Sequence, residues 1–262
     1  MLETLRNAFK VKDIRDRILF TFLMLIVIRI GSQLPVPGVN GDVFKSWFES
    51  QAAGLGFFDA ITGGSFLSMS VFALNITPYI TSSIIMQLLT IAIPALEELQ
   101  KDGEDGRKKI AEFTRYLTVG LALFESSAMT FGFWRSGYLL QKNALTVITV
   151  VTALTAGSAV LMWIGERITE RGVGNGISIV LVINIISRIP ADMGALWNQF
   201  IDGKGLLQGV IAAVVILAVI IGMVVFVIVL QGAERRIPVQ YSKKMQGRKQ
   251  VGGQQTHIPL KV

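Results

Sequence analysis

Six apolar stretches, separated by polar or charged segments, constrain the fold of this chain more than any other feature. They cover residues 18–34, 71–96, 116–134, 145–164, 177–189 and 206–230. A helix needs roughly 20 apolar residues to cross a bilayer, so the fifth stretch, with roughly 13, could by itself be a buried or re-entrant segment. Hydrophobic residues make up 52% of the chain and charged residues only 16%. We therefore expect an all-α polytopic membrane protein with six transmembrane helices.

The basic residues fall mainly on one side of the predicted membrane. If both termini are cytoplasmic, 19 of the 25 Lys and Arg residues lie in cytoplasmic segments and 5 in external ones, with Arg29 inside the first stretch. Cytoplasmic loops carry an excess of Lys and Arg, so this distribution predicts that both termini are cytoplasmic. Orientation also explains much of the net charge of +7 without a nucleic-acid partner.

The second apolar stretch carries polar residues near its middle, among them Asn75, Ser83 and Gln87. Hydrocarbon offers no hydrogen-bond partner to such groups, so they belong where a helix faces other helices or a water-filled cavity. The stretch is therefore predicted to form the wall of a conduit or binding cavity.

The residue types exclude several kinds of chemistry. The chain has no cysteine, which excludes disulfides, thiol catalysis and thiolate metal sites. Its single histidine, His257, lies near the C-terminus, and no Ser/His/Asp set or paired carboxylates appear. We expect no enzyme activity, no catalytic residue, no metal and no cofactor.

Three segments outside the apolar stretches have a composition of their own. Residues 1–17 alternate apolar and charged side chains in a way that suits an amphipathic helix on the cytoplasmic surface. Residues 57–68 are broken by glycine but apolar, so they form either a half-helix folded back into a cavity or a loop packed on the surface. Residues 232–262 are basic and rich in Gly and Gln, which favours an exposed arm or hairpin that offers cations to an anionic partner.

Long motifs run through the chain nearly from end to end. They are PVPG at 35–38, GGSF at 63–66, SVFALNITPYITSSIIMQLL at 70–89, DGEDGRKKIAEFTRYLT at 102–118, LMWIGERITERGVGNGISI at 161–179 and QQTHIPLKV at 254–262. These motifs closely resemble the SecY family, the channel subunit of the bacterial protein translocase.

The resemblance implies ten membrane spans in two five-helix halves, related by an inverted repeat around an hourglass pore. Residues 18–194 would form the first half, with a re-entrant plug half-helix at 57–68. Residues 195–231 would supply an external loop and the sixth span, and 232–262 a basic cytoplasmic loop. Because the family continues into a seventh span, we expect the second half to be truncated here or supplied by another chain.

The resemblance also implies roles for individual residues. An apolar pore ring would consist of Ile76, Ile80 and Leu181, although without the resemblance all three would be taken for ordinary core residues. The plug would include Phe57, Phe58, Ile61, Gly63, Gly64, Phe66 and Leu67. The lateral gate would use Asn75, Ser83 and Gln87. A docking surface for the ribosome or a motor would use Arg235, Arg236, Lys243, Lys244, Arg248 and Lys249.

The implied function is that of the central pore-forming subunit in the bacterial plasma membrane. Such a channel passes unfolded polypeptides and releases signal or transmembrane segments laterally into membrane lipid. The implied partners are the small subunits SecE and SecG, the SecA motor ATPase, the ribosome with its RNA and proteins, signal sequences and nascent polypeptides. The alternative is a secondary transporter with a broken-helix substrate site, in which Arg29 or Glu125 would couple ion movement.

Overall fold

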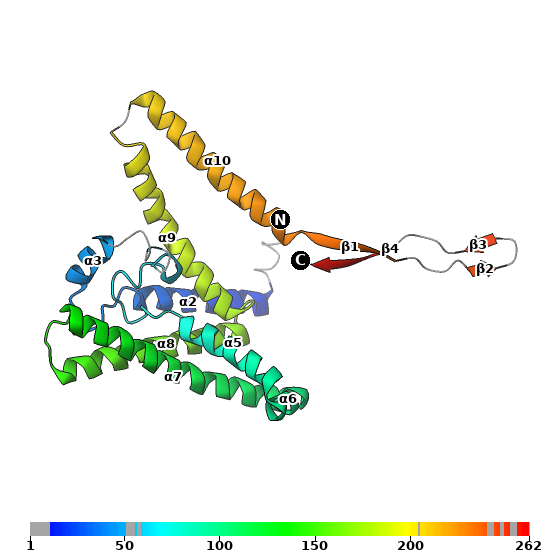
Figure 1. Cartoon of the computed structure of the whole chain (residues 1–262), viewed down its shortest axis with the longest axis horizontal. Coiled ribbons are helices and arrows are strands. Elements are labelled where there is room, and N and C mark those ends of the chain that lie inside the picture. Colours follow the sequence, from blue (N-terminus) through cyan, green and yellow to red (C-terminus); the bar gives the residue numbers. More distant parts are fainter. Residues whose placement is uncertain are drawn as a thin grey trace. The chain divides into compact units, whose positions relative to one another are not determined.

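The computed structural model describes residues 11–50, 56, 59–203, 205–239, 244–246, 249–251 and 256–261. The chain divides into two compact units, Met1–Pro190 and Ala191–Val262 (Figure 1). Each unit is described by itself.

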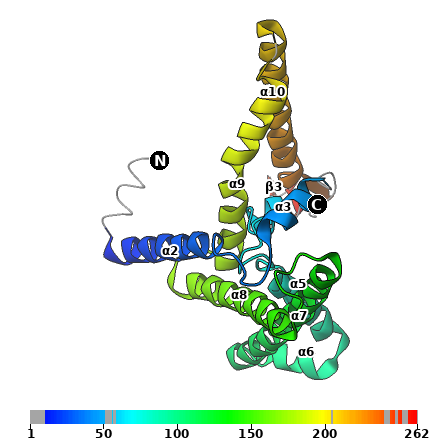
Figure 2. The same ribbon diagram turned by 90° about the vertical axis from the view of Figure 1, so that its left-hand side faces the viewer.

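The first unit is a helical bundle. Its elements are α2 (Lys12–Gly31), α3 (Gly41–Ser50), α5 (Thr77–Ala92), α6 (Pro94–Lys101), α7 (Glu104–Ser136), α8 (Ala144–Arg171) and the first part of α9 (Gly176–Phe200). The two longest helices, α7 and α8, lie side by side, α5 packs on α7, and α2 packs on α8 (Figure 1, Figure 2).

The ends of these helices follow from local sequence. Helix α7 begins after Gly103 and ends at Gly137, both with positive φ, which glycine adopts without steric cost. Pro94 cannot continue the hydrogen bonding of α5, so the chain bends there by 102° into α6. Helix α9 is capped by Asn175, whose Oδ1 accepts the backbone N–H groups of Ile177 and Ser178 at 3.0 and 3.3 Å.

Among the described residues of the first unit, two apolar clusters hold the helices together. One gathers aromatic side chains around Phe44 of α3, with ring centroids 5.4 Å from Phe133 and 5.6 Å from Phe66. The other joins α2, α5, α8 and α9 around Ile76, Leu161 and Val180. Helix α8 also approaches the segment before α5 very closely: a Cβ at Gly157 would overlap the carbonyl oxygen of Val71.

The predicted helical membrane fold is confirmed, but the count of six spans is not. Among the described residues, three helices are long and apolar enough to cross a membrane by themselves: Ala144–Arg171, Gly176–Phe200 and Leu207–Gln231. The bent pair α5 and α6 would make a fourth. The first and third predicted stretches lie in α2 and α7, which are helical but carry more charge.

Several predicted boundaries differ from the structure. Residues 71–76 form turns, so the second helix begins only at Thr77. The external loop expected from residue 195 is helical as far as Phe200, because α9 continues past Pro190 through residues that favour helix. The surface helix expected to end at residue 17 and the span expected to begin at residue 18 are not separate elements over the described residues: α2 runs unbroken from Lys12 to Gly31.

The second unit contains the end of α9, helix α10 (Leu206–Gln231) and a basic β-hairpin. Strand β1 (Glu234–Val239) pairs antiparallel with β4 (Thr256–Lys261), in a register that places Glu234 opposite Lys261. Further along, β2 (Lys244–Gln246) pairs with β3 (Lys249–Val251). Of the two forms expected for this tail, the described strands have the hairpin form.

Candidate functional site

The candidate site is built around the segment predicted to be a plug, which we call the plug segment (residues 57–68). Its described part begins with a helical turn at residues 59–62 and continues as a chain of turns before α5. Phe57 and Phe58 lie outside the described residues. Ile61, Gly63, Gly64, Phe66 and Leu67 lie within them.

The plug segment satisfies its own backbone hydrogen bonds. Every backbone N–H from residue 63 to residue 70 donates to an acceptor within residues 59–66. Two of these acceptors are side chains: Thr62 Oγ1 accepts from Phe66 at 3.3 Å, and Asp59 Oδ1 accepts from Leu67 at 2.9 Å. Irregular backbone with internally satisfied donors can lie among membrane helices without water.

The carboxylate of Asp59 also joins the plug segment to α9. Asp59 has no exposed surface, and its Oδ2 forms an ion pair with Nη1 of Arg188, whose side chain is 28% exposed. One carboxylate oxygen therefore organises the turn while the other bonds to a neighbouring helix. A buried carboxylate requires such partners, because an isolated charge in an apolar interior is very costly.

Asn75 is the second polar link to the plug segment. Its φ of +53° is left-handed, a conformation that asparagine tolerates better than most residues. Its Nδ2 donates to the carbonyl of Ile61 at 3.2 Å, while its Oδ1 accepts from Nδ2 of Asn184 at 3.0 Å. Oγ of Ser158 donates to the Asn75 carbonyl at 3.3 Å. The amide side chain of Asn75 thus bonds to the plug segment and to α9, and its backbone carbonyl bonds to α8.

The face of α9 that meets these groups carries Asn184 and Arg188, four residues apart and therefore on one side of the helix. The plug segment lies directly on this face, since a Cβ at Gly63 would be 2.6 Å from the carbonyl oxygen of Asn184. Gly63 also has φ +67°, so two independent constraints favour glycine at this position.

The structure brings the three predicted pore-ring residues into one apolar cluster. Ile76 is fully buried, while Ile80 and Leu181 are half-buried and pack against the same group of side chains. Their assignment to a pore ring stays a prediction.

The three predicted lateral-gate residues do not form one group. Asn75 belongs to the buried link described above. Ser83 and Gln87, by contrast, line a pocket of about 220 Å³ that is also bordered by Gln100 of α6 and Arg107 of α7. The gate assignment stays a prediction.

The predicted docking residues are described only in part. Arg235 and Arg236 are exposed on β1, and as neighbours on a strand they point to opposite faces of the hairpin. The backbone of Lys244 lies in β2 and that of Lys249 in β3. Lys243 and Arg248 lie outside the described residues.

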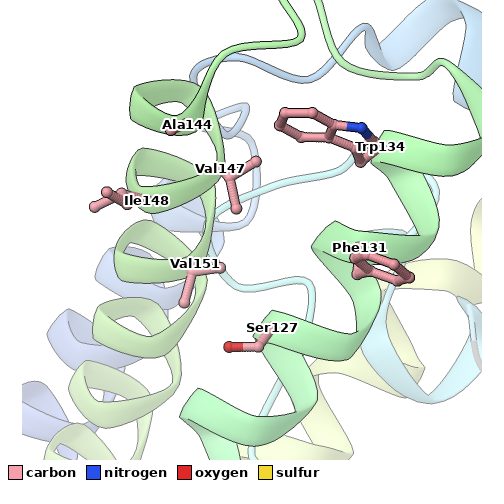
Figure 3. Close-up of a pocket in the computed structure, with 7 residues that line it drawn as sticks. All are labelled: Ser127, Phe131, Trp134, Ala144, Val147, Ile148 and Val151. Atoms are coloured by element: carbon pink, nitrogen blue, oxygen red, sulfur yellow. The ribbon is translucent and has the colours of Figure 1, made fainter.

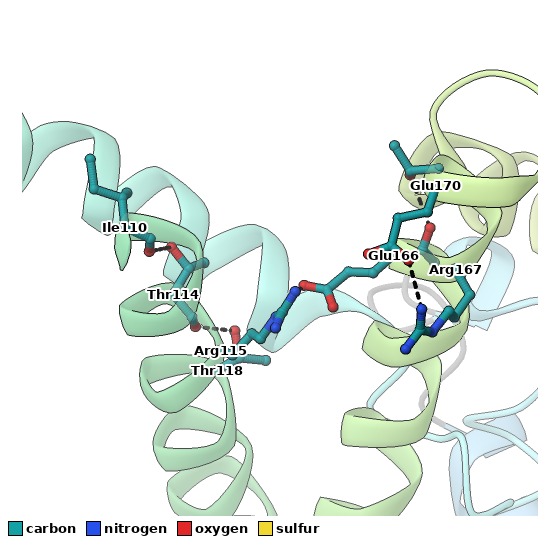
Figure 4. A network of polar contacts seen from close by, with 9 residues as sticks. Ile110, Thr114, Arg115, Thr118, Glu166, Arg167 and Glu170 are labelled. Carbon is teal, nitrogen blue, oxygen red and sulfur yellow. Dashed lines mark hydrogen bonds and ion pairs between the residues drawn. The ribbon is translucent and has the colours of Figure 1, made fainter. Parts of the chain in front are cut away.

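Figure 4 shows a group of ion pairs at α7 and α8, in which the link between the two helices, from Arg115 to Glu166, was missed from the sequence. Nε of Arg115 lies 2.8 Å from Oε1 of Glu166, and this hydrogen bond raises the pKa of the Arg115 guanidinium above its ordinary value. Nearby, Arg167 forms an ion pair with Glu170 at 2.7 Å, and its guanidinium lies 5.6 Å from the centroid of the Trp163 ring.

A pocket between α7 and α8 has a volume of about 430 Å³ (Figure 3). Its lining is mostly apolar, with the hydroxyl of Ser127 and the indole N–H of Trp134 as its polar groups. It consists of Ser127, Phe131, Trp134, Ala144, Val147, Ile148 and Val151. Phe131 and Ile148 are more than half exposed, as is expected for side chains that face lipid. Among the residues that the structure describes, no group of His, Cys, Asp or Glu could hold a metal ion.

Sequence reasoning also missed Asp59, Ser158, Asn184 and Arg188. Arg188 enters the sequence analysis only within the count of five external cations. The available signal was that two opposite charges, Asp59 and Arg188, lie in or at the end of otherwise apolar segments. Ionisable residues in such surroundings usually pair.

Comparison with known proteins gives the family context. Residues 70–262 match the protein family described as SecY. The chain is 43% identical to protein translocase subunit SecY of Halalkalibacterium halodurans, 45% identical to that of Bacillus licheniformis and 41% identical to that of Thermotoga maritima. Each match covers 100% of this chain and 62% of the relative, so the chain spans about 62% of their length.

Solved structures share the fold. "The structure of a protein conducting channel" superposes with a TM-score of 0.53 at 19% identity, over 94% of this chain and 52% of that one. "Sec61 in the Canine ribosome-channel complex from the endoplasmic reticulum" superposes with a TM-score of 0.53 at 18% identity, over 86% of this chain and 49% of that one.

Proposed function

The chain belongs to the SecY family, and from this premise we propose that it forms the first half, the sixth span and a cytoplasmic hairpin of a protein-conducting channel. The channel passes unfolded polypeptides across the bacterial plasma membrane and releases apolar segments laterally into lipid. The relatives are named as translocase subunits, which does not favour the secondary-transporter alternative.

One observation carries the proposal: after its helical turn at residues 59–62, the plug segment is irregular, hydrogen-bonded within itself and seated against α9. A membrane anchor has no use for such a segment, because irregular backbone is tolerated among membrane helices only where protein buries it or water lines it. A plug that closes a water-filled pore and moves out of it must keep its own fold when it leaves its neighbours. Internal hydrogen bonds allow this, and the contact with α9 gives the plug a resting position.

The remaining roles fit around the plug segment. Ile76, Ile80 and Leu181 contribute aliphatic side chains to a constriction that excludes water and ions but deforms around a polypeptide. Ser83 and Gln87 place polar groups on the gate side of α5, where weak hydrogen bonds keep the closed state metastable. Asn75, the third predicted gate residue, donates a hydrogen bond to the plug segment at Ile61.

The partners supply the energy and the rest of the conduit. The exposed cations of the hairpin, including Arg235 and Arg236, suit a polyanionic ribosome or the SecA motor. One structural neighbour is a channel in a ribosome complex. SecE and SecG would complete the membrane assembly. The chain itself is a passive conduit without enzyme activity, with both termini in the cytoplasm.

The test is reconstitution of the chain, completed to the length of its relatives, with its partner subunits in liposomes. A secretory precursor should become protected from external protease when motor and ATP are present. The same precursor with two charges in the apolar core of its signal should stay accessible. If neither precursor is protected while a known translocase in parallel vesicles protects the first, the channel proposal is wrong.

A further inference from the structure

We propose that Asp59 and Arg188 are positioning residues that hold the plug segment on α9, and that their ion pair sets how strongly a signal sequence must bind before the channel opens. This inference rests on the proposed channel function. It concerns the contacts of two named residues and not the existence of a plug.

The ion pair joins the plug segment directly to α9. Asp59 lies in the plug segment, where one of its carboxylate oxygens receives the N–H of Leu67 at 2.9 Å. The other oxygen meets Nη1 of Arg188 on α9. If the plug segment keeps its internal fold when it moves, this pair is a charged contact that must break when the segment leaves its seat.

The neighbouring contacts give the seat its specificity. Asn184, one helical turn before Arg188, donates to Asn75, which in turn donates to the carbonyl of Ile61. Gly63 lies against the Asn184 carbonyl, and Gly64 is near enough to Arg188 that a Cβ would be 3.3 Å from Nη1. Two turns of α9 therefore hold the plug segment: Arg188 contacts it by charge, and Asn184 contacts Gly63 and is linked to Ile61 through Asn75.

The two members of the pair differ in exposure, and this difference predicts an order of effects. Removing Arg188 leaves the fully buried Asp59 carboxylate without its cation, which strongly destabilises the seat. Removing the charge of Asp59 leaves an arginine that is 28% exposed and can turn toward water, so the effect is smaller. Removing both charges leaves no buried carboxylate charge that has lost Arg188. The destabilisation of the seat in the double variant should therefore be close to that caused by removing the charge of Asp59 alone.

The experiment measures plug position with a single thiol. Ser65 is 2% exposed, and the chain has no cysteine, so Ser65→Cys introduces a reporter that is hidden while the plug segment is seated. In the complete membrane complex, with the rest of the channel and the accessory subunits made free of cysteine, the labelling rate of this thiol by an impermeant maleimide is compared among variants. These are Arg188→Gln, Asp59→Asn, the double variant and Arg188→Lys, with exposed Arg135→Gln as the matched control.

We expect Arg188→Gln to raise the labelling rate roughly tenfold or more, Asp59→Asn to raise it less, and the double variant to resemble Asp59→Asn. Arg188→Lys should largely restore the slow rate, and Arg135→Gln should match the parent. Asparagine keeps the side-chain oxygen that accepts from Leu67, so Asp59→Asn removes the charge and leaves the turn intact. A precursor with a weakened signal should be transported better in the order of the labelling rates.

Equal labelling in the parent and in Arg188→Gln would overturn the proposal. So would a double variant that labels faster than both single variants, because that result indicates general loosening. The labelling arm needs no transport, so a complex that labels as expected but transports nothing counts against the channel function and not against the positioning pair. Circular dichroism of each purified variant identifies any that fail to fold.

Discussion

At the scale of single residues, contacts in which one backbone touches another give the sharpest constraints in this molecule. Gly157 and Gly63 each face a carbonyl oxygen of another segment at a distance that leaves no room for a Cβ. Interiors are packed densely, so an added methyl group at such a place must move a whole helix. These glycines therefore define how closely α8 and α9 can approach the turns before α5.

Gly157→Ala should lower stability by roughly 1–3 kcal/mol, because its Cβ would overlap the Val71 carbonyl and force α8 away. Thermal unfolding of the purified complex in detergent would measure the loss. Gly120→Ala is the matched control: this helical glycine of α7 faces open space, and alanine there should be neutral or slightly stabilising. Equal melting temperatures for both variants would contradict the close-approach argument.

Replacing Ile80 and Leu181 by Asn should raise the resting ion conductance of the complete channel, because polar side chains wet an aliphatic constriction. Planar-bilayer recordings without substrate would measure it. The same change at Ile85 and Ile91 serves as the comparison; Ile91 is 80% exposed at the far end of α5. If both pairs leak alike, the effect is general destabilisation and the ring assignment is wrong.

At the scale of elements, the two longest helices, α7 and α8, pack side by side, and an ion pair between Arg115 and Glu166 joins them. Arg115 and Glu166 lie on different helices, and each would lose a charged partner if the helices separated. Arg115 is 44% exposed, so water and salt weaken the attraction, and packing of the helices contributes more than this pair.

A double-mutant cycle with Arg115→Gln and Glu166→Gln should give a coupling of about 0.2–1 kcal/mol, falling with added salt. Chemical unfolding in detergent is the measurement. The pair of Lys108 and Asp105, which lies within α7 and is far more exposed, should give a smaller coupling. A coupling that is independent of salt would point to packing and not to charge.

The sequence anticipated some of these elements and could not anticipate others. Helices α8 and α10 were predicted because long apolar runs report spans directly. The turns at residues 71–76 were missed because their apolar composition matches that of the helix that follows. Hydropathy also does not report that Asn75 has a left-handed backbone conformation. The link from Asn75 to Asn184 joins residues 109 positions apart, and no spacing rule reports such a pair.

At the scale of the whole molecule, the orientation of the chain in the membrane is predicted by the sequence and not by the fold of either unit. The asymmetric distribution of Lys and Arg predicts which face is cytoplasmic. On this prediction the basic hairpin β1–β4 would lie on the cytoplasmic side, where a large anionic partner could reach it. Two predictions test this arrangement.

Single cysteines at Gly247 and at Ala53 should react with an impermeant thiol reagent from opposite faces of the membrane, because the cation distribution places residue 247 inside and residue 53 outside. Labelling of intact cells and of inverted vesicles measures the two sides. Detergent-permeabilised samples, in which both should react, are the control. Reaction of both from the same face would overturn the topology.

Charge reversal of Arg235 and Arg236 should weaken binding to ribosomes in a salt-dependent way, because polyanionic RNA releases counterions when cations bind. The slope of log K against log salt should fall by roughly 1 for each phosphate contact removed. Co-sedimentation of proteoliposomes with ribosomes across a salt series measures it. Reversal of Lys142, outside the hairpin, is the control, and unchanged affinity at low salt would leave only a role in orientation for the arginines.

The internal hydrogen bonding of residues 63–70 has a consequence for amide hydrogen exchange. Because these N–H groups donate to acceptors within residues 59–66, departure of the segment from α9 would break none of them. Exchange at these amides reports whether the turn is folded, not where it lies. Protons protected in the closed state would stay protected in the open one, and the segment would return to its seat without a refolding step.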